Sequence, residues 1–333
     1  MYVYLHPKWP QIQWDEVLLK THSLAIQKEV LEIELFSKNT EVFKNTQNEL
    51  RFLDFSANMA LQGENKFNNH APLSLKTKRY QSVFYQLFYN SKAFFKGHLT
   101  EAYLSDVYEQ FFDNTSSIYR KDKDALQMSS CDFGRERVIY QAPNSQDLRE
   151  QFSLFFKHLS QIKSNHYVLS AIAHWWLKLL YPYASENDWM ARVAGDFYLR
   201  KEIFMGIAPA LQINQKDYQK QLEISRKSGL DLTGWLLWYL EQIQVLIQKI
   251  KEQFHKEKIK HDFKSHHSSK NLNSRQKKVL KLLLHDFKGH LTTKKWAKIT
   301  KTSLENATQD LESLNTQKIL KLNKSGEWKL CLD

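Results

Sequence analysis

The chain has 333 residues, a formal net charge of +12, 42% hydrophobic residues and 25% charged residues. This composition is typical of globular proteins and excludes disorder over the whole length. At roughly 100–200 residues per domain, it predicts two or three domains. Only 9 Gly and 6 Pro occur, which favours helices over a sheet with many tight turns. The cysteines, Cys131 and Cys331, are too few for a disulfide framework or a four-cysteine zinc site.

The first half of the chain predicts long helices separated by polar loops. Asp15 can cap the helix that follows the Trp9–Asp15 turn. Residues 61–75 contain Gly63 and Pro72 and predict a loop. One or two helices over residues 16–53 carry an apolar stripe of Leu24, Leu31, Leu35, Val42, Leu50 and Leu53. Further helices are expected over Lys78–Phe95, Thr100–Asn114, Asp147–Ile162, His166–Leu180, Trp189–Glu202, Lys216–Ser225 and Asp231–Lys258.

Two segments differ from this helical pattern. Arg135–Pro143 is short, contains β-branched residues and ends at a proline, so it predicts one strand of an exposed hairpin. Residues 256–272 are rich in Lys, His and Ser and predict a linker. After it, helices over Ser274–His285, Thr293–Thr300 and Ser303–Leu314 and strands over Ile319–Leu322 and Glu327–Leu332 are expected. Three helices followed by a hairpin is the order of a winged helix-turn-helix.

The positive charge is concentrated at the C-terminal end. Residues 251–333 hold 19 Lys and Arg and 9 Asp and Glu, a net charge of +10, whereas the first 250 residues have a net charge of +2. This asymmetry predicts a polyanionic partner such as nucleic acid. A surface that only improves solubility explains it equally well.

The segment Tyr181–Arg192, with the sequence YPYASENDWMAR, lies between two predicted helices, where a helix N-terminus can bind an anion. It resembles a degenerate form of the motif HPFxDGNGRxxR of the Fic (Fido) family. Fic proteins are mostly enzymes that transfer AMP from ATP to a protein hydroxyl. The resemblance implies a helical Fic domain and predicts that this segment holds the site.

Other parts of the chain resemble one bacterial group of Fic proteins, in the same order. Trp9–Leu19 resembles the Fic-associated N-terminal domain of the DUF4172 type, and Ser228–Leu236 resembles the segment that closes the Fic domain. Leu272–Leu320 resembles the helix-turn-helix unit of that group. Glu136–Pro143 resembles the flap, the hairpin against which a target segment lies, with candidate flap residues Val138, Ile139 and Tyr140.

Most of the motif's chemistry is replaced. Tyr181 stands at the position of the general base, and a phenol, with an ordinary pKa of about 10, is a poor base at pH 7. Ser185 stands at the position of the acidic Mg²⁺ ligand. Glu186 and Asp188 stand at the positions of the two glycines that let backbone N–H groups approach the phosphates. Each adds a negative charge that repels a polyphosphate by about 1 kcal/mol. Trp189 replaces the first arginine. Losing the base alone costs roughly 10²–10⁴ in rate.

Some positions of the motif are retained. Tyr183, Asn187 and Arg192 form the candidate remnant of the nucleotide site, because the resemblance implies that the asparagine and the second arginine meet the phosphates. Asn58–Gly63 aligns with the inhibitory S/TxxxEG motif of many Fic enzymes, with Gln62 and Gly63 in place of Glu-Gly. We expect Gln62 to form a weaker hydrogen bond with Arg192 than a glutamate would.

The candidate recognition helix, Ser303–Leu314, has no Lys or Arg and three acidic residues. The candidate DNA-binding residues are therefore Asn306 and Gln309 on this helix and basic residues around it, Lys294, Lys295, Lys298 and Lys324. This arrangement favours contact with the DNA backbone over readout of sequence. A protein-interaction or dimerisation module is the alternative. His174 lies among tryptophans and is expected in the core, and no metal site is predicted.

The sequence predicts a mainly α protein: a Fic-like helical domain with a hairpin flap, and a winged helix domain. The expected parts are an N-terminal helical segment (1–95), a Fic-like core (96–255), a linker (256–272) and the winged helix (273–333). The function expected is that of an inactive Fic protein, a cytoplasmic bacterial binding or regulatory module without cofactor. Its expected partners are an unidentified protein, DNA or a second copy, and no membrane. Two alternatives stay open: a protein adenylyltransferase that uses ATP and Mg²⁺ in a remodelled site, and a DNA-binding transcriptional regulator.

Overall fold

The computed structural model describes residues 2–36, 40–63, 75–90, 97–112, 118–121, 127–132, 135–267, 271–284, 287, 289–323 and 325–331. The chain divides into two compact units, Met1–Gln253 and Phe254–Asp333. The first unit includes both the predicted N-terminal segment and the predicted core as one body. Most of the predicted loop over 61–75 lies outside the described residues.

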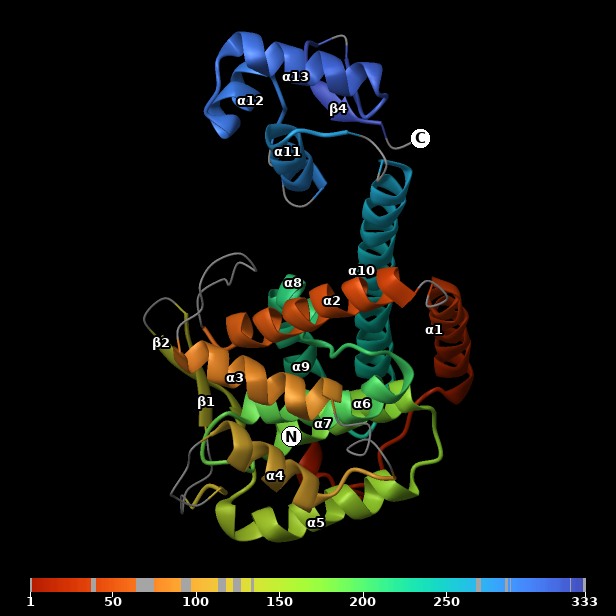
Figure 1. The fold of residues 1–333 in the computed structure, drawn as a ribbon. Coiled ribbons are helices and arrows are strands. Elements are labelled where there is room, and N and C mark those ends of the chain that lie inside the picture. The colour runs from red at the N-terminus through yellow and green to blue at the C-terminus, as the bar shows by residue number, and fades with distance from the viewer. Residues whose placement is uncertain are drawn as a thin grey trace. The chain divides into compact units, whose positions relative to one another are not determined.

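The first unit is mainly helical (Figure 1). Its described elements are η1 (Val3–Leu5), α1 (Glu16–Phe36), α2 (Thr40–Leu61), α3 (Leu75–Tyr85), the π-helical turn η2 (Gln86–Asn90), α4 (Glu101–Phe111), β1 (Gln127–Asp132), β2 (Arg135–Gln141), α5 (Ser145–Gln161), α6 (His166–Leu180), α7 (Asn187–Glu202), α8 (Ala208–Ile213), α9 (Gln215–Ser225) and α10 (Thr233–His267). The mainly α fold class is therefore confirmed.

Helices α6 and α7 pack against each other and form the centre of this unit (Figure 1). The Asn165 side chain accepts a hydrogen bond from the Val168 N–H and caps α6. Every residue of α6 from Tyr167 to Leu180 is buried, which is the pattern of a helix surrounded by protein on all sides. Because the motif segment joins these two helices, its ends are held by the core.

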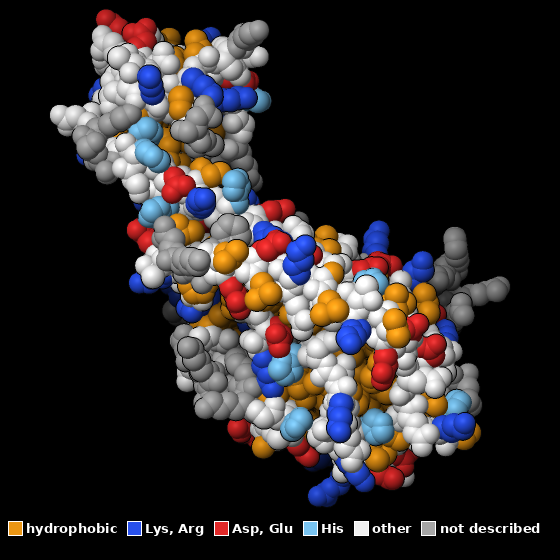
Figure 2. All heavy atoms as spheres, turned by 90° about the vertical axis from the view of Figure 1, so that its right-hand side faces the viewer, with side chains coloured by type: hydrophobic (Ala, Val, Ile, Leu, Met, Phe, Trp, Pro, Cys, Tyr) orange, Lys and Arg blue, Asp and Glu red, His pale blue; other side chains and the backbone are white. Residues whose placement is uncertain are grey.

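Helix α1 buries a different face from the one predicted. Leu19, Ile26, Val30 and Ile33 are buried, whereas Leu24, Leu31 and Leu35 of the predicted stripe are 55%, 61% and 62% exposed. At 100° per residue, these two sets lie on opposite sides of the helix. Figure 2 faces this side of the molecule and shows hydrophobic side chains among charged ones on its surface. Aliphatic residues lie on both faces of α1, so their periodicity did not distinguish the buried face from the exposed one.

The hairpin is confirmed, but one of its residues belongs to the core. Strands β1 and β2 pair antiparallel, with Gln127 opposite Gln141 and Asp132 opposite Arg135. Val138 is 45% exposed, whereas Tyr140 is fully buried. The Tyr140 hydroxyl donates to the Leu179 carbonyl at 2.7 Å and so fastens the end of β2 to α6. Tyr140 is therefore an anchor of the hairpin and not an exposed flap residue.

The N-terminal segment is fastened to the helical body at several points. The Trp9 indole donates to Gln151 at 2.9 Å and its ring lies 4.8 Å from Trp176. Gln13 forms a parallel bridge with Asp231. The Leu18 N–H donates to the Asp15 carboxylate at 2.9 Å, so the predicted cap of α1 is present.

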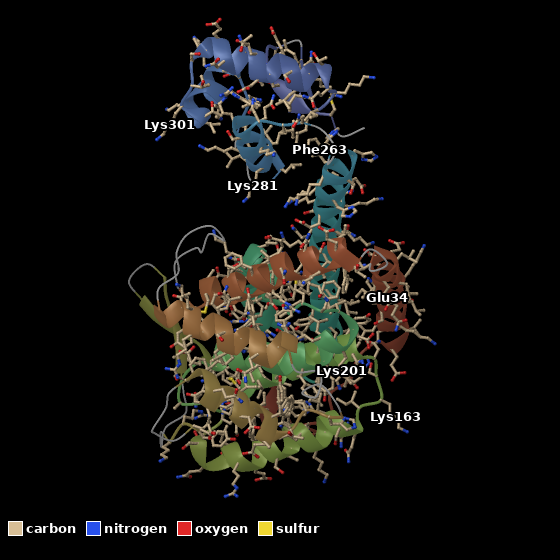
Figure 3. The ribbon with its side chains drawn as sticks, in the orientation of Figure 1. Glu34, Lys163, Lys201, Phe263, Lys281 and Lys301 are labelled. Carbon is tan, nitrogen blue, oxygen red and sulfur yellow. The ribbon has the colours of Figure 1, made fainter. Side chains whose placement is uncertain are left out.

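The second unit contains the end of α10, the helices α11 (Ser274–Leu284), α12 (Thr293–Thr300) and α13 (Leu304–Thr316), and an antiparallel hairpin of β3 (Leu320–Leu322) and β4 (Trp328–Leu330). The linker prediction is wrong for residues 256–267, which continue α10. No Gly or Pro interrupts this stretch, and Phe263, labelled in Figure 3, packs into the apolar cluster of the second unit. Hydrophobic burial thus outweighs the polar composition.

A buried carboxylate holds the second unit together. The Asp310 side chain is 4% exposed and accepts hydrogen bonds from Arg275 at 2.7 and 3.0 Å. It also accepts from Asn273 at 2.6 Å and from the buried Trp296 indole at 3.2 Å. One of the three acidic residues on the candidate recognition helix therefore faces the core, which leaves Glu305 and Glu312 on the surface. Among the described residues, no helix has the length and hydropathy that crossing a membrane requires.

We predict that Asp310→Ala lowers the free energy of unfolding of the second unit by about 3 kcal/mol. The side chains of Asn273 and Trp296 would lose their acceptor, and Arg275 would lose its ion pair. Hydrogen exchange of residues 274–316, followed by mass spectrometry, should accelerate roughly 100-fold. Although burial raises the pKa of Asp310, Arg275 holds it below the usual value. The loss of unfolding free energy in the variant is therefore fully present above about pH 4, and it disappears as the pH falls through the folded-state pKa of Asp310. The exposed Glu312→Ala is the control, and an equal effect there would contradict the assignment.

Candidate functional site

The motif segment, Tyr181–Arg192, contains two residues in unusual backbone conformations. Tyr181 ends α6 with a φ of 46°, and Glu186 precedes α7 with a φ of 60°. Both lie in the left-handed region that non-glycine residues seldom adopt. Between them, the Arg120 N–H donates to the Pro182 carbonyl at 3.1 Å and the Ala184 N–H donates to the Ile118 carbonyl at 2.9 Å. These bonds hold the segment in a fixed, extended path.

Arg120 binds backbone carbonyl groups at the start of the segment, a role that the sequence did not predict. Its buried guanidinium donates to the carbonyl oxygens of Tyr181 at 2.7 Å and Leu180 at 3.3 Å, and to that of Pro143. It thereby satisfies carbonyl groups at the C-terminus of α6. An isolated arginine about 60 residues away from the segment gives no local signal of this role.

Lys178 brings a buried ammonium group to the side chain of Tyr181. Its side chain is 2% exposed, and its ammonium donates to the Tyr181 hydroxyl and forms an ion pair with the half-exposed Asp188. The ammonium also lies 4.6 Å from the centre of the Tyr181 ring. Partial burial raises the pKa of Asp188, but Lys178 reverses this and holds it below its usual value. The carboxylate that replaces a motif glycine is thus stabilised as an anion by a residue of α6.

Asn187 is occupied by the segment's own backbone. Its side-chain oxygen accepts from the Tyr183 N–H and its amide nitrogen donates to the Tyr183 carbonyl, both at 2.9 Å. Tyr183 is buried and stacks on Tyr108, with the ring centres 5.1 Å apart. Both polar groups of the Asn187 side chain therefore stabilise the loop.

Arg192 and Gln62 do not form the hydrogen bond that the sequence predicted. The buried Arg192 donates through Nε to the Asn58 side-chain oxygen at 2.8 Å. Gln62 instead donates to the Glu186 carboxylate at 2.7 Å. Burial raises the pKa of Glu186 above its usual value, although Arg192 opposes this. The motif alignment placed Gln62 at the inhibitory position, but Asn58, about one helical turn earlier on α2, reaches Arg192.

A buried network extends this contact across α2 and α7. Asn58 donates to the Asp54 carboxylate at 3.1 Å, and Asp54 also forms an ion pair with Arg200. The Tyr89 hydroxyl donates to Asp54 at 2.6 Å and the Gly206 N–H at 3.0 Å. A Cβ atom at Gly206 would lie 2.1 Å from the Asp196 carboxylate, so only glycine fits there. The retained Arg192 is thus held by a neutral amide that a buried carboxylate orients.

Two further positions of the segment contact aromatic residues. Trp189, at the position of the first arginine, is 2% exposed and lies 4.8 Å from the Phe111 ring. The Ser185 hydroxyl lies 3.0 Å from the Tyr108 hydroxyl. His174 is buried, as predicted, and its Nε2 lies 2.8 Å from the Tyr218 hydroxyl. Among the described residues, no group of three or more His, Cys, Asp and Glu residues has the arrangement of a metal site.

The candidate DNA-binding residues lie in the second unit. Lys294, Lys298, Asn306 and Gln309 are exposed. The Lys295 ammonium lies 4.5 Å from the centre of the Phe287 ring. Lys324 lies outside the described residues, as does the side chain of the flap candidate Ile139.

No family model matches this sequence, and no curated protein matches it. The structure is similar to a Fic family protein from Desulfovibrio desulfuricans G20, with a TM-score of 0.52, 13% identity and coverage of 93% of this chain and 96% of that one. A Fic domain containing signaling protein from Bacteroides thetaiotaomicron VPI-5482 gives a TM-score of 0.45, 12% identity and coverage of 69% and 95%. The first similarity shows that this chain has the Fic fold.

We predict that Asn187→Ala lowers the free energy of unfolding of the first unit by about 2 kcal/mol, because two backbone groups of Tyr183 lose their partners. Urea unfolding followed by circular dichroism measures the change. Asn144→Ala is the matched control, since Asn144 is exposed and its side chain caps no N–H group. Equal stability of the two variants would contradict the structural role of Asn187.

Proposed function

We propose that this protein is a non-catalytic Fic-fold protein that acts as a binding or regulatory module. The observation that carries the proposal is the distribution of charge at the start of α7. Glu186 and Asp188 present carboxylates there, Lys178 is paired with Asp188, and Arg192 is held by Asn58. A polyphosphate at this helix N-terminus would meet two anions, and the Lys178 ammonium is already paired with one of them.

Acid–base chemistry at the segment is also disfavoured. A phenol is a poor base at neutral pH, and the Tyr181 oxygen already accepts a hydrogen bond from the Lys178 ammonium. Trp189 fills the place of a phosphate-binding arginine with an apolar ring. An AMP transferase built on this segment would therefore need a base and a phosphate clamp from elsewhere.

We predict that the full chain, incubated with labelled ATP and Mg²⁺ or Mn²⁺, labels neither itself nor proteins of a bacterial lysate. A Fic enzyme with an intact motif serves as the positive control. Calorimetry with ATP and Mg²⁺ should give no binding heat. Labelling by the wild type that Arg192→Ala abolishes would overturn the proposal.

A double variant tests whether the two carboxylates at the start of α7 repel the nucleotide. Glu186→Gly/Asp188→Gly removes both opposing carboxylates, and the φ of 60° at position 186 suits glycine. We expect this variant to bind ATP with an affinity at least about tenfold above the upper limit set by the wild-type titration, since each carboxylate contributes about 1 kcal/mol of repulsion. Unchanged affinity would show that charge at the start of α7 is not what excludes the nucleotide.

A second function, contact with the DNA backbone by the second unit as a winged helix, is favoured by one observation. Because Asp310 faces the core, the exposed surface of α13 carries fewer acidic side chains than the helix contains. Lys294 and Lys298 are exposed on the preceding helix. Such contacts neutralise phosphates without reading bases. A transcriptional regulator with sequence preference would need base contacts from Asn306 and Gln309.

We predict that the full chain binds a 20-base-pair duplex of random sequence at low salt, with affinity that falls linearly on a log–log plot against salt. Lys294→Gln/Lys298→Gln should reduce the salt slope by about 2. The control is Lys157→Gln/Lys163→Gln, which removes the same charge from exposed positions of the first unit. Absence of salt-sensitive binding, or equal loss in both variants, would exclude this interface.

A further inference from the structure

A cavity of about 380 Å³ lies between the N-terminal segment, the end of β2 and the start of α5. Its volume is within the range of small-ligand sites, roughly 300–1,000 Å³. The residues that line it are Tyr2, Tyr4, Leu5, Gln141, Ala142, Pro143, Asn144, Asp147, Glu150 and Gln151. It contains no residue of the motif segment. We refer to it as the η1–α5 cavity.

The walls of the η1–α5 cavity are held firmly. Val3 is buried, and its N–H donates to the Arg226 carbonyl at 3.2 Å. The Tyr4 hydroxyl donates to the Gln141 carbonyl at 2.7 Å, which joins the N-terminal wall to the end of β2. The floor is formed by the buried Ala142 and Pro143. The cavity is thus formed by residues with fixed positions on three sides.

The charged lining residues are all acidic. Asp147 and Glu150 lie in the first two turns of α5, and both are exposed. Among the described residues, no Lys or Arg side chain lines the cavity. Arg120 contacts the lining residue Pro143, and its guanidinium is also bonded to the carbonyls of Leu180 and Tyr181. The lining therefore offers acceptors and negative charge to a ligand.

Aromatic rings form the wall next to these carboxylates. The Tyr2 and Tyr4 rings stack with centres 6.0 Å apart and planes inclined by 12°. Both rings pack edge-on against Tyr140. A π surface beside carboxylates is the combination that attracts ammonium and guanidinium groups.

We propose that the η1–α5 cavity binds an organic cation, a guanidinium or ammonium group that contacts the two tyrosine rings and pairs with Asp147 and Glu150. Such a group is presented either by a free amine or by a basic side chain of a protein segment. The inference goes beyond the proposed function, because it gives the first unit a ligand chemistry that does not involve the motif segment or a nucleotide.

The test is calorimetric titration of the full chain, without nucleotide, with L-arginine amide and with a neutral peptide that carries one arginine. Citrulline amide and the citrulline peptide are the uncharged probes. We expect the arginine probes to bind and the citrulline probes to bind at least about fivefold more weakly, since the loss of cation–π attraction and of charge pairing adds up. Tighter binding of the peptide than of the amide indicates a protein segment as the source, and equal binding indicates a free amine.

Variants locate the binding. Asp147→Asn/Glu150→Gln should weaken arginine amide about tenfold, and Tyr2→Leu about threefold. Glu109→Gln, an exposed acidic residue on α4, is the control and should leave the affinity unchanged. The amide variants are at exposed positions, and their melting temperature reports whether the fold is kept. No heat with millimolar arginine amide, or equal affinity of the wild type and the double variant, would overturn the proposal.

Discussion

The buried carboxylate of Asp54 is the constraint on which the first unit depends. A fully buried charge requires partners that compensate for the loss of water. Here α7 supplies Arg200, the α7–α8 connection supplies the Gly206 N–H, and η2 supplies the Tyr89 hydroxyl. The remaining oxygen of Asp54 accepts from Asn58, which in turn holds Arg192. One buried side chain on α2 therefore contacts α7, η2 and the α7–α8 connection together.

The side chains of the motif segment are engaged in contacts within the fold. Asp188 pairs with Lys178, while Trp189 packs against Phe111. Asn187 bonds twice to the backbone of Tyr183. Each of these contacts stabilises the path of the segment between α6 and α7.

Much of the fold was predictable because its helices have clear ends. Helix α6 was predicted over its observed range, since Asn165 caps it and its residues are apolar throughout. The six-residue α8 was missed, because so short a helix has little periodicity. The end of α10 was placed too early, since the polar composition of this stretch hid the packing of Phe263 into the apolar cluster of the second unit. At the candidate site, the contacts of Lys178 and Arg120 were not predicted, because they arise between residues of different elements.

By itself, the sequence determined the helical class and most of the order of the elements. These follow from residue identity and spacing. Only the tertiary structure decided which face of α1 is buried, that Asn58 and not Gln62 reaches Arg192, and that Asp310 turns inward. Each of these depends on which side chains come within about 3 Å across separate helices, a distance that packing sets and local patterns do not encode.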